Sequence, residues 1–132
     1  MTLGDLENIC KNIKYFKGVF MRDLLPKNVD KIECGIVNLD SYKGSGTHWV
    51  CYYKKDKIKY YFDSYGGKPP KELVKYLGKD NIFMNDSMIQ NYDDPPICGH
   101  LCVYVLNELS VNRFDSVINN LILNKYGFKK YI

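Results

Sequence analysis

Hydrophobic residues recur at helical spacing near the start of the chain, at Leu3, Leu6, Cys10 and Ile13. Thr2 and Asp5 stand three residues apart at the beginning of this pattern, as in a capping box. We therefore expect a first helix over residues 3–14. The stretch 16–22 that follows is apolar but has no regular period, and we expect it to be irregular.

The middle of the chain alternates between short apolar runs and turn-forming residues, which is typical of strands. Residues 34–39 form an apolar run that predicts a buried strand, and residues 82–84 predict another. Two runs rich in aromatic and β-branched residues, 47–53 and 58–63, flank the polar residues 54–57. This arrangement predicts a β-hairpin.

Further helices are predicted in the second half of the chain. Pro69-Pro70 opens a short helix and Gly78 ends it. A buried helix begins at Cys98, because apolar residues then follow an i, i+3, i+4, i+7 stripe at positions 98, 101, 102, 105, 106 and 109. A last helix is expected over 112–127, with an inward face at Phe114, Val117, Ile118, Leu121 and Ile122.

These elements indicate an α+β fold, in which helices flank a small mixed or antiparallel sheet. No repeat, linker or low-complexity tract divides the chain, so residues 1–132 are predicted to form a single domain. This length suffices to bury a core without metals or disulfides as staples. Shares of 45% hydrophobic and 26% charged residues agree with an ordinary folded domain.

Composition and charge narrow the classes of function. No apolar run is as long as a membrane span, and the first residues lack the layout of a signal peptide. The five cysteines are scattered, without a CxxC pair, which favours reduced thiols and an intracellular protein. The net charge is only +4 and the lysines are dispersed, which is typical of a solvated surface and gives only mild support for a nucleic-acid or acidic partner.

A metal site is not expected, and neither is a cofactor. Cys98, His100 and Cys102 could suggest zinc ligands. At positions i, i+2 and i+4 of a helix, however, the middle side chain leaves the face shared by the other two. We expect His100 to be a packing or surface residue instead.

The predicted hairpin brings together two side chains with catalytic chemistry. A two-residue turn at 55–56, or a four-residue loop over 54–57, would place His48 directly opposite Asp63. Cross-strand Cβ atoms lie about 4.5–5.5 Å apart, so the carboxylate could accept a hydrogen bond from the imidazole. A three- or five-residue loop would put the two on opposite faces. Such a carboxylate fixes the tautomer of the imidazole and stabilises it when it takes a proton.

A base of this kind needs a nucleophile, and the candidates are Cys98, Ser45 and Ser64. The predicted helix N-terminus and a neighbouring imidazolium would both lower the pKa of the Cys98 thiol. The two serines stand in turn-like sequences, and this context accounts for their presence without a catalytic role. A cysteine on an apolar stripe is usually a small core residue, as Cys102 is expected to be. In combination with His48 and Asp63, Cys98 is the preferred nucleophile.

Four pieces of the sequence, in this order, resemble the adenovirus-type and SUMO-deconjugating cysteine peptidases. They are Gly46-Thr47-His48-Trp49-Val50, Tyr61-Phe62-Asp63-Ser64-Tyr65-Gly66, Gln90, and Cys98-Gly99-His100. The resemblance runs from about residue 16 to the helix that begins at Cys98. Adenovirus proteases carry Glu at the third triad position, so Asp63 is closer to the SUMO-type pattern.

The resemblance implies a papain-like peptidase fold of the adenovirus-protease type and assigns the site residues. His48 would be the base, Asp63 its orienting acid, Cys98 the nucleophile and Gln90 a donor of the oxyanion hole. In these families the Trp after the catalytic His lines a narrow passage that favours glycine. Trp49 is therefore expected to bind substrate, with small residues such as Gly-Gly before the scissile bond, although most tryptophans are core anchors.

The expected function is thus a cysteine endopeptidase that processes precursor or capsid proteins of a virus or virus-like element. The substrate would be a protein or peptide, and the enzyme would act as a monomer in the host cytoplasm or nucleus, or packaged in a virion. An activating peptide or DNA is a further partner that the resemblance suggests. Two alternatives remain: a deconjugase of a ubiquitin-like modifier, and a non-catalytic binding or scaffold protein with a peptidase fold.

Overall fold

The structure is a computed structural model that describes residues 1–40, 48–85, 88–89, 97–111, 113–114, 116–117 and 128–130. Its helices are α1 (Leu3–Cys10), α2 (Lys71–Leu77) and α3 (Cys98–Leu109). Its strands are β1 (Phe16–Met21), β2 (Ile32–Asn38), β3 (Trp49–Lys55), β4 (Ile58–Phe62), β5 (Ile82–Asn85) and β6 (Phe128–Lys130). Among these described residues no helix is long and apolar enough to cross a membrane.

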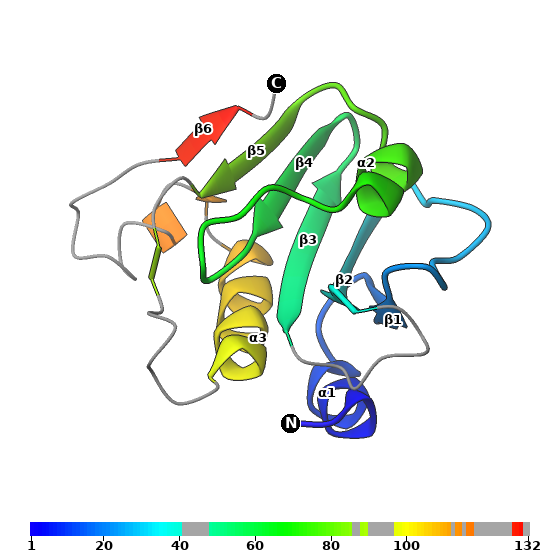
Figure 1. Cartoon of the computed structure of the whole chain (residues 1–132), viewed down its shortest axis with the longest axis vertical. Helices are drawn as coiled ribbons and strands as arrows, with labels where there is room; N and C mark the ends of the chain where they lie inside the picture. Colours follow the sequence, from blue (N-terminus) through cyan, green and yellow to red (C-terminus); the bar gives the residue numbers. More distant parts are fainter. Residues whose placement is uncertain are drawn as a thin grey trace.

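The strands form one mixed sheet whose spatial order follows the chain, from β1 to β6 (Figure 1). β1 pairs with β2 in parallel, and β4 pairs with β5 in parallel. The pairs β2–β3, β3–β4 and β5–β6 are antiparallel. The predicted α+β class, a small mixed sheet flanked by helices, is confirmed.

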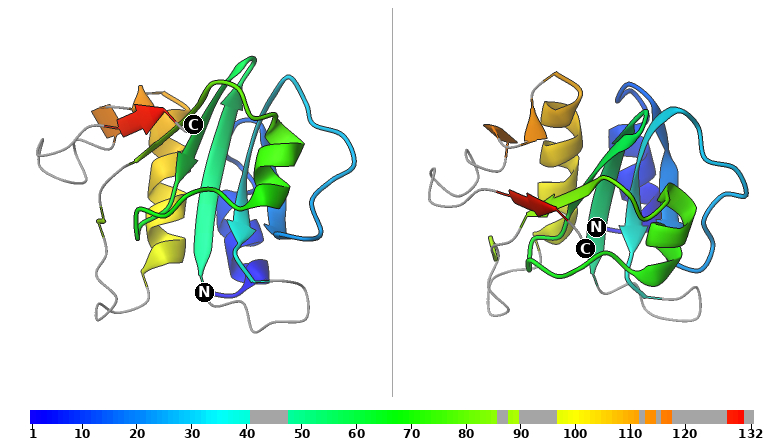
Figure 2. Two further views of the ribbon diagram at one scale, coloured as in Figure 1. Left: turned by 45° about the horizontal axis from the view of Figure 1, so that its top comes forward. Right: turned by 90° about the horizontal axis from the view of Figure 1, so that it is seen from above.

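Helices cover both faces of the sheet (Figure 2). One face packs against α1 and α3, and its buried side chains include Leu6, Cys51 and Leu106. The other face packs against α2, through residues such as Tyr61 and Leu73. Successive residues of β3 and β4 alternate between the two clusters, because side chains of a strand point alternately to opposite faces. The central hairpin is thereby fixed from both sides.

Several local predictions are confirmed by the structure. Thr2 and Asp5 exchange the two hydrogen bonds of a capping box at the start of α1. The short helix opened by Pro69-Pro70 is α2, and Gly78 ends it with a φ of 89° that glycine adopts readily. The predicted helix from Cys98 is α3, which begins at that residue.

Other predictions were wrong or incomplete. The first helix ends at Cys10 rather than 14, because the chain then turns toward Tyr15, whose φ is 65°. The stretch 16–22, expected to be irregular, contains strand β1 instead. The pairing of β1 with β2 shifts between Phe16 and Gly18, and Val19 is the one buried residue of β1, so the sequence shows no strand period. Strand β6 was not predicted.

The last predicted helix, 112–127, lies largely outside the described residues. Phe114 and Val117, two of its expected inward residues, are described and are almost fully buried in the core cluster beneath α3.

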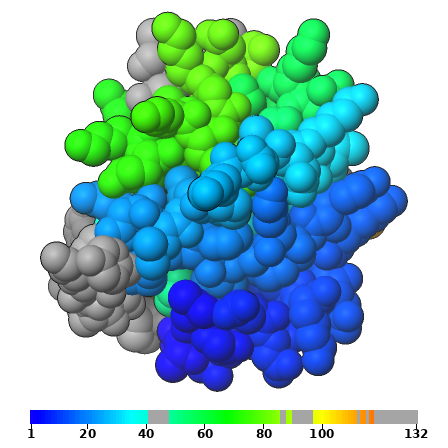
Figure 3. Space-filling model, turned by 90° about the vertical axis from the view of Figure 1, so that its right-hand side faces the viewer, coloured from blue at the N-terminus to red at the C-terminus, as the bar shows by residue number. Residues whose placement is uncertain are grey.

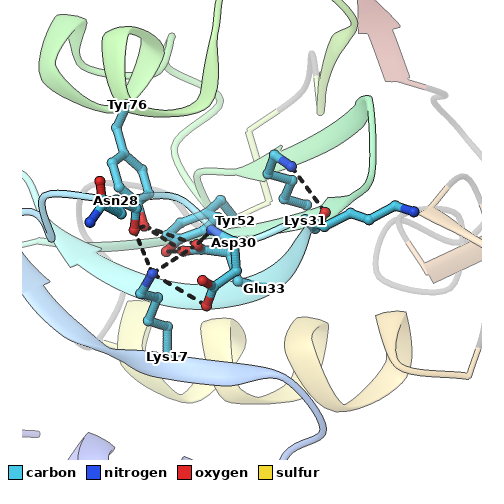
Figure 4. A network of polar contacts seen from close by, with 8 residues as sticks. Lys17, Asn28, Asp30, Lys31, Glu33, Tyr52 and Tyr76 are labelled. Atoms are coloured by element: carbon cyan, nitrogen blue, oxygen red, sulfur yellow. Dashed lines mark hydrogen bonds and ion pairs between the residues drawn. The ribbon is translucent and has the colours of Figure 1, made fainter.

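The buried carboxylate of Glu33 accepts hydrogen bonds both from the side of the sheet that α2 covers and from the connection between β1 and β2 (Figure 4). Glu33 on β2 is 1% exposed and accepts hydrogen bonds from Tyr52 on β3, at 2.6 Å, and from Tyr76 on α2, at 2.8 and 2.9 Å. Lys17 on β1 lies 3.3 Å from the same carboxylate, and the Asp30 N–H donates to it at 2.6 Å. Figure 3 shows the N-terminal segment and the β1–β2 connection side by side on this side of the molecule.

Candidate active site

The candidate site is built at the open end of the β3–β4 hairpin. The turn is formed by residues 56–57, since Lys55 pairs with Ile58 and the ladder continues to Cys51 opposite Phe62. Extending this register places His48 opposite residue 65 rather than opposite Asp63. The predicted direct opposition of His48 and Asp63 is therefore wrong by two residues. A slip of two residues keeps both side chains on the same face, which explains why they still meet.

His48 and Asp63 form a close pair. Nε2 of His48 lies 2.7 Å from Oδ1 of Asp63, with the side chains 11% and 5% exposed. The ring of Tyr65, the residue that the register sets opposite His48, stacks on the imidazole at a centroid distance of 4.4 Å and an interplanar angle of 21°. The other ring nitrogen, Nδ1, is buried. The imidazole is thus oriented by one nitrogen and stacked on one face, and the second nitrogen is left to serve a reacting group.

The turn after β4 fixes the carboxylate of Asp63. The N–H of Tyr65 donates to Oδ1 at 2.8 Å, and the N–H of Gly67 donates to Oδ2 at 3.2 Å. Asp63 is 3% exposed, so these backbone donors replace the water that the carboxylate has lost. The sequence indicates this turn through Gly66-Gly67, but does not show that its N–H groups reach Asp63.

Asn85, at the end of β5, holds the backbone of Asp63 from the neighbouring strand. Its Oδ1 accepts from the Asp63 N–H at 3.1 Å, and its Nδ2 donates to the Asp63 carbonyl at 2.7 Å. Both groups belong to one amide that is fully buried. Sequence reasoning missed Asn85, because its partner lies 22 residues away and no local pattern marks it.

Cys98 begins α3 and is 5% exposed. Burial alone would raise the pKa of its thiol. Hydrogen bonding from His48, and from the backbone of Trp49 and Gly99, together with the charge of His48, outweighs burial and lowers this pKa below the usual 9.0. These are the conditions under which a cysteine carries a reactive thiolate.

The effect on His48 is reciprocal. Burial acts to lower the pKa of His48, but hydrogen bonds and negative charge from Asp63 and Cys98 outweigh it and raise the pKa from 6.5 to about 9. The structure therefore brings His48, Asp63 and Cys98 into one interacting group. Each of the two groups therefore stabilises the charged form of the other, because opposite charges that lie close together favour ionisation.

The remaining cysteines contrast with Cys98. Burial is the main cause that raises the pKa of the thiols of Cys10, to about 11, and of Cys34 and Cys102. Cys102 is fully buried in the core, as predicted, and its Sγ donates to the carbonyl of Trp49 at 3.5 Å. His100 is exposed on α3.

Trp49 lies beside the start of α3. It is 6% exposed, and its indole N–H donates to the carbonyl of Met1 at 3.3 Å. A Cβ on Gly99 would lie 3.5 Å from Cδ1 of Trp49 and 3.3 Å from Sδ of Met1. The tryptophan is thus mostly a core residue, with its indole edge turned toward the residue that follows Cys98.

Gln90 and Ser45 lie outside the described residues. The residue before Gln90 is described: the N–H of Ile89 donates to the carbonyl of Ser64 at 2.8 Å. The chain just ahead of Gln90 is therefore attached to the same turn that follows Asp63. Ser64 itself is fully buried in that turn.

Comparison with known proteins gives a fold but no family. No family model and no curated protein matches the sequence. Among solved structures, the crystal structure of the ASFV pS273R protease is similar with a TM-score of 0.53 at 13% identity, over 90% of this chain and 61% of that chain. A selenomethionine structure of the same protease matches 71% of this chain and 42% of that chain, with a TM-score of 0.47 and 16% identity. The chain thus has the fold of part of this protease and spans about three fifths of its length at most.

Proposed function

We propose that the chain is a cysteine peptidase in which Cys98 is the nucleophile, His48 the general base and Asp63 the residue that orients the base. The observation that carries the proposal is the 2.7 Å contact between His48 and Asp63, beside a cysteine whose thiol pKa is lowered by that same histidine. The fold shared with a viral protease supports the same conclusion.

The proposed reaction is acyl transfer to sulfur, followed by hydrolysis. The Cys98 thiolate attacks the carbonyl carbon of a peptide or isopeptide bond, and the C–N bond then breaks to leave a thioester. The imidazolium of His48 gives its proton to the leaving amine. Neutral His48 next takes a proton from water, whose oxygen attacks the thioester; the C–S bond breaks and releases the carboxylic acid, which leaves the Cys98 thiolate beside the imidazolium of His48. Asp63 keeps the imidazole oriented and stabilises its charged form throughout.

The oxyanion of each tetrahedral intermediate needs donors close to Cys98. Cys98 is the first residue of α3, so its backbone N–H is among those that make no intrahelical hydrogen bond. We assign this N–H and the side-chain amide of Gln90 to the oxyanion hole. Loss of one such donor typically costs roughly 2.7–4 kcal/mol of transition-state stabilisation. The assignment of Gln90 is supported by its position one residue after the hydrogen bond between Ile89 and the turn at Ser64.

The substrate that we propose is a precursor or capsid protein of a virus or virus-like element, cut after small residues. Support comes from the viral origin of the similar ASFV protease, and from Trp49 beside Gly99 at the start of α3. A flat indole close to the nucleophile leaves little room for side chains on the residues before the scissile bond. We further propose that the chain acts as a monomer and needs no metal or cofactor.

Alkylation of the thiols by iodoacetamide tests the nucleophile directly. Wild-type protein should be alkylated rapidly at Cys98, and the rate should fall in His48→Ala. Cys102→Ala is the matched control, since Cys102 lies on the same helix with a thiol pKa raised by burial. Reaction at Cys98 no faster than at an ordinary exposed thiol would instead support a non-catalytic scaffold.

Hydrolysis assays test the substrate. A fluorogenic peptide ending in Gly-Gly should be cleaved, and Cys98→Ala should lower kcat/KM by about 10³-fold or more. Equal cleavage of peptides with bulky residues at the two glycine positions would contradict the role given to Trp49. Preference for a folded ubiquitin-like modifier over the short peptide would identify a deconjugase. Stimulation by a peptide or by DNA, added to the same assay, would reveal an activator.

A further inference from the structure

The closed end of the β3–β4 hairpin contains a polar cavity. It has a volume of about 340 Å³ and is lined by Lys54, Asp56, Lys57, Lys59, Leu77, Asp80 and Asn81. Lys54 lies six residues along the chain from His48, so the cavity is about 20 Å from the candidate active site, at 3.4 Å per residue of strand. This cavity takes no part in the proposed peptidase chemistry.

Lys54 and Lys59 are buried side by side in the wall of this cavity. They are register partners on β3 and β4, so their side chains project from the same face of the sheet. They are only 9% and 7% exposed. Burial, and next the charge of Lys54, lower the pKa of Lys59, while Asp80 acts in the opposite direction. Like charges placed directly opposite each other destabilise a sheet, so this arrangement calls for a compensating charge.

The protein supplies these two ammonium groups with neutral partners. Nζ of Lys54 donates to the carbonyl of Lys31 at 2.9 Å. Nζ of Lys59 donates to the carbonyls of Gly78, at 3.1 Å, and Asp80, at 2.7 Å. Neither lysine forms an ion pair with a carboxylate in the part of the chain that the structure describes. Each ammonium has three N–H donors, so donors remain for a ligand in the cavity.

We propose that this cavity binds a small molecule that carries a phosphate group, held by Lys54 and Lys59 with the exposed Lys57 at the rim. Lysine ammonium groups are common partners of phosphate. A cavity of about 340 Å³ is at the lower end of the range for small-molecule sites. Asp56 and Asp80 also line it, which disfavours a long polyanion and favours one compact anionic group. The apolar side chain of Leu77 is available to the organic part of the molecule.

NMR titration of the full chain tests this proposal, with sodium phosphate and glycerol 3-phosphate as probes and ionic strength held constant by sodium chloride. Both probes should cause saturable shifts of the amides of residues 54, 59 and 81. Lys57→Met should weaken binding by roughly threefold, as expected for one surface charge. Lys54→Met should weaken it by roughly tenfold or more, because a charge-assisted hydrogen bond is lost. Lys71→Met, which removes an exposed lysine of α2 outside the cavity, should leave binding unchanged.

Lys57 is exposed, so Lys57→Met should fold normally. This variant therefore tests phosphate binding even where substitution of the buried Lys54 prevents folding. Tighter binding of glycerol 3-phosphate than of phosphate would show that the organic part contributes. Shifts that do not saturate, or that spread over lysines across the surface, would mean an adventitious ion only. Equal effects of Lys57→Met and Lys71→Met would overturn the proposal. So would an oligonucleotide that displaces phosphate and binds much more tightly, since the cavity would then serve a polyanion.

Discussion

Asn85 and Asp63 exchange two hydrogen bonds, in which one buried amide accepts from the backbone N–H of Asp63 and donates to its carbonyl. The carboxylate of the same Asp63 contacts His48. The backbone of Asp63, the proposed orienting acid, is therefore held by β5, a strand that carries none of the three proposed catalytic residues. We infer that Asn85 is a positioning residue that acts through Asp63.

We expect Asn85→Ala to lower kcat by about 10²-fold with little change in KM, because a displacement of the acid by about 1 Å misplaces the imidazole. Asn85→Asp should be at least as damaging, since a second carboxylate would be buried beside Asp63. Both are measured by steady-state hydrolysis of the Gly-Gly peptide.

The control for Asn85 is Tyr52→Phe, which removes a buried hydrogen bond of 2.6 Å to Glu33 away from the site. It should lower the free energy of unfolding by about 1–3 kcal/mol, through the loss of a hydrogen bond to a charged group, and leave kcat unchanged. If kcat falls equally in Tyr52→Phe and Asn85→Ala, the effect of Asn85 is one of general stability.

Gly67 leaves room for the carboxylate of Asp63. A Cβ at this position would lie 2.7 Å from Oδ2 of Asp63, closer than real contacts allow, in addition to the hydrogen bond that the Gly67 N–H makes to that atom. Gly67→Ala should therefore displace the carboxylate and lower kcat/KM by about tenfold or more while the protein stays folded.

The matched substitution is Gly4→Ala in α1, where the nearest atom to the new Cβ is 3.9 Å away. Alanine favours a helix over glycine by about 1 kcal/mol, so this variant should be slightly more stable and fully active. Circular dichroism melts and the peptide assay, applied to both variants, compare the two outcomes. Full activity of Gly67→Ala would show that the Asp63 carboxylate tolerates displacement.

Asp63→Asn should shift the pH dependence of the site in a defined direction. Burial lowers the pKa of His48, and hydrogen bonds and charge from Asp63 and Cys98, of which the Asp63 hydrogen bond is the largest, raise it to about 9. Without the charge of Asp63, the pKa of His48 should fall by roughly one to three pH units. The imidazolium then loses its proton at lower pH, the pKa of Cys98 rises, and alkylation of Cys98 requires more alkaline solution.

This shift is followed by NMR titration of the His48 ring protons and by alkylation rates between pH 5 and 10 on the wild-type protein and Asp63→Asn. Asp23→Asn, which neutralises an exposed carboxylate elsewhere, should reproduce the wild-type curves. The interpretation of the triad fails if the His48 pKa is the same in Asp63→Asn and in the wild type.

The network around Glu33 should affect stability without affecting catalysis. Glu33→Ala leaves Lys17 and two tyrosine hydroxyls without their shared partner, and breaking a buried ion pair in this way typically costs about 3–5 kcal/mol. We expect a large drop in the denaturant midpoint. Where the variant remains folded at low denaturant, Cys98 should be alkylated at the wild-type rate. A lower alkylation rate in the folded variant would show that this network reaches the active site.

The parts of the fold that were predictable from sequence are those with a local signal. The capping box of Thr2 and Asp5 needs only neighbouring residues, and the apolar stripe after Cys98 repeats for three turns of α3. The strand β1 lacked such a signal, because Gly18 interrupts it and only Val19 is buried. Its place in the sheet comes from parallel pairing with β2 rather than from its own pattern.

The register of the hairpin shows where sequence reasoning stops. A turn at 55–56 and a turn at 56–57 would each be able to join the two strands. The lysine-rich sequence around them contains no glycine that would select one of the two turns. The structure uses the second turn, with Asp56 at a φ of 60°, a conformation that Asp tolerates better than most residues. The partners of Asp63 on β5 and in the turn at 65–67 depend on tertiary packing, so they could not be read from the chain.

The contact between Trp49 and Met1 has a practical consequence for anyone who prepares this protein. The Met1 carbonyl receives the indole N–H, and Met1 lies against Gly99, the residue after Cys98. Any peptide fused ahead of Met1 would thus extend from the protein surface next to Cys98. It would compete there with the peptide substrate that we propose. The last described element, β6, lies at the opposite side of the molecule from the N-terminus (Figure 1). A purification tag is therefore better placed at the C-terminal end of the chain, beyond β6, than ahead of Met1.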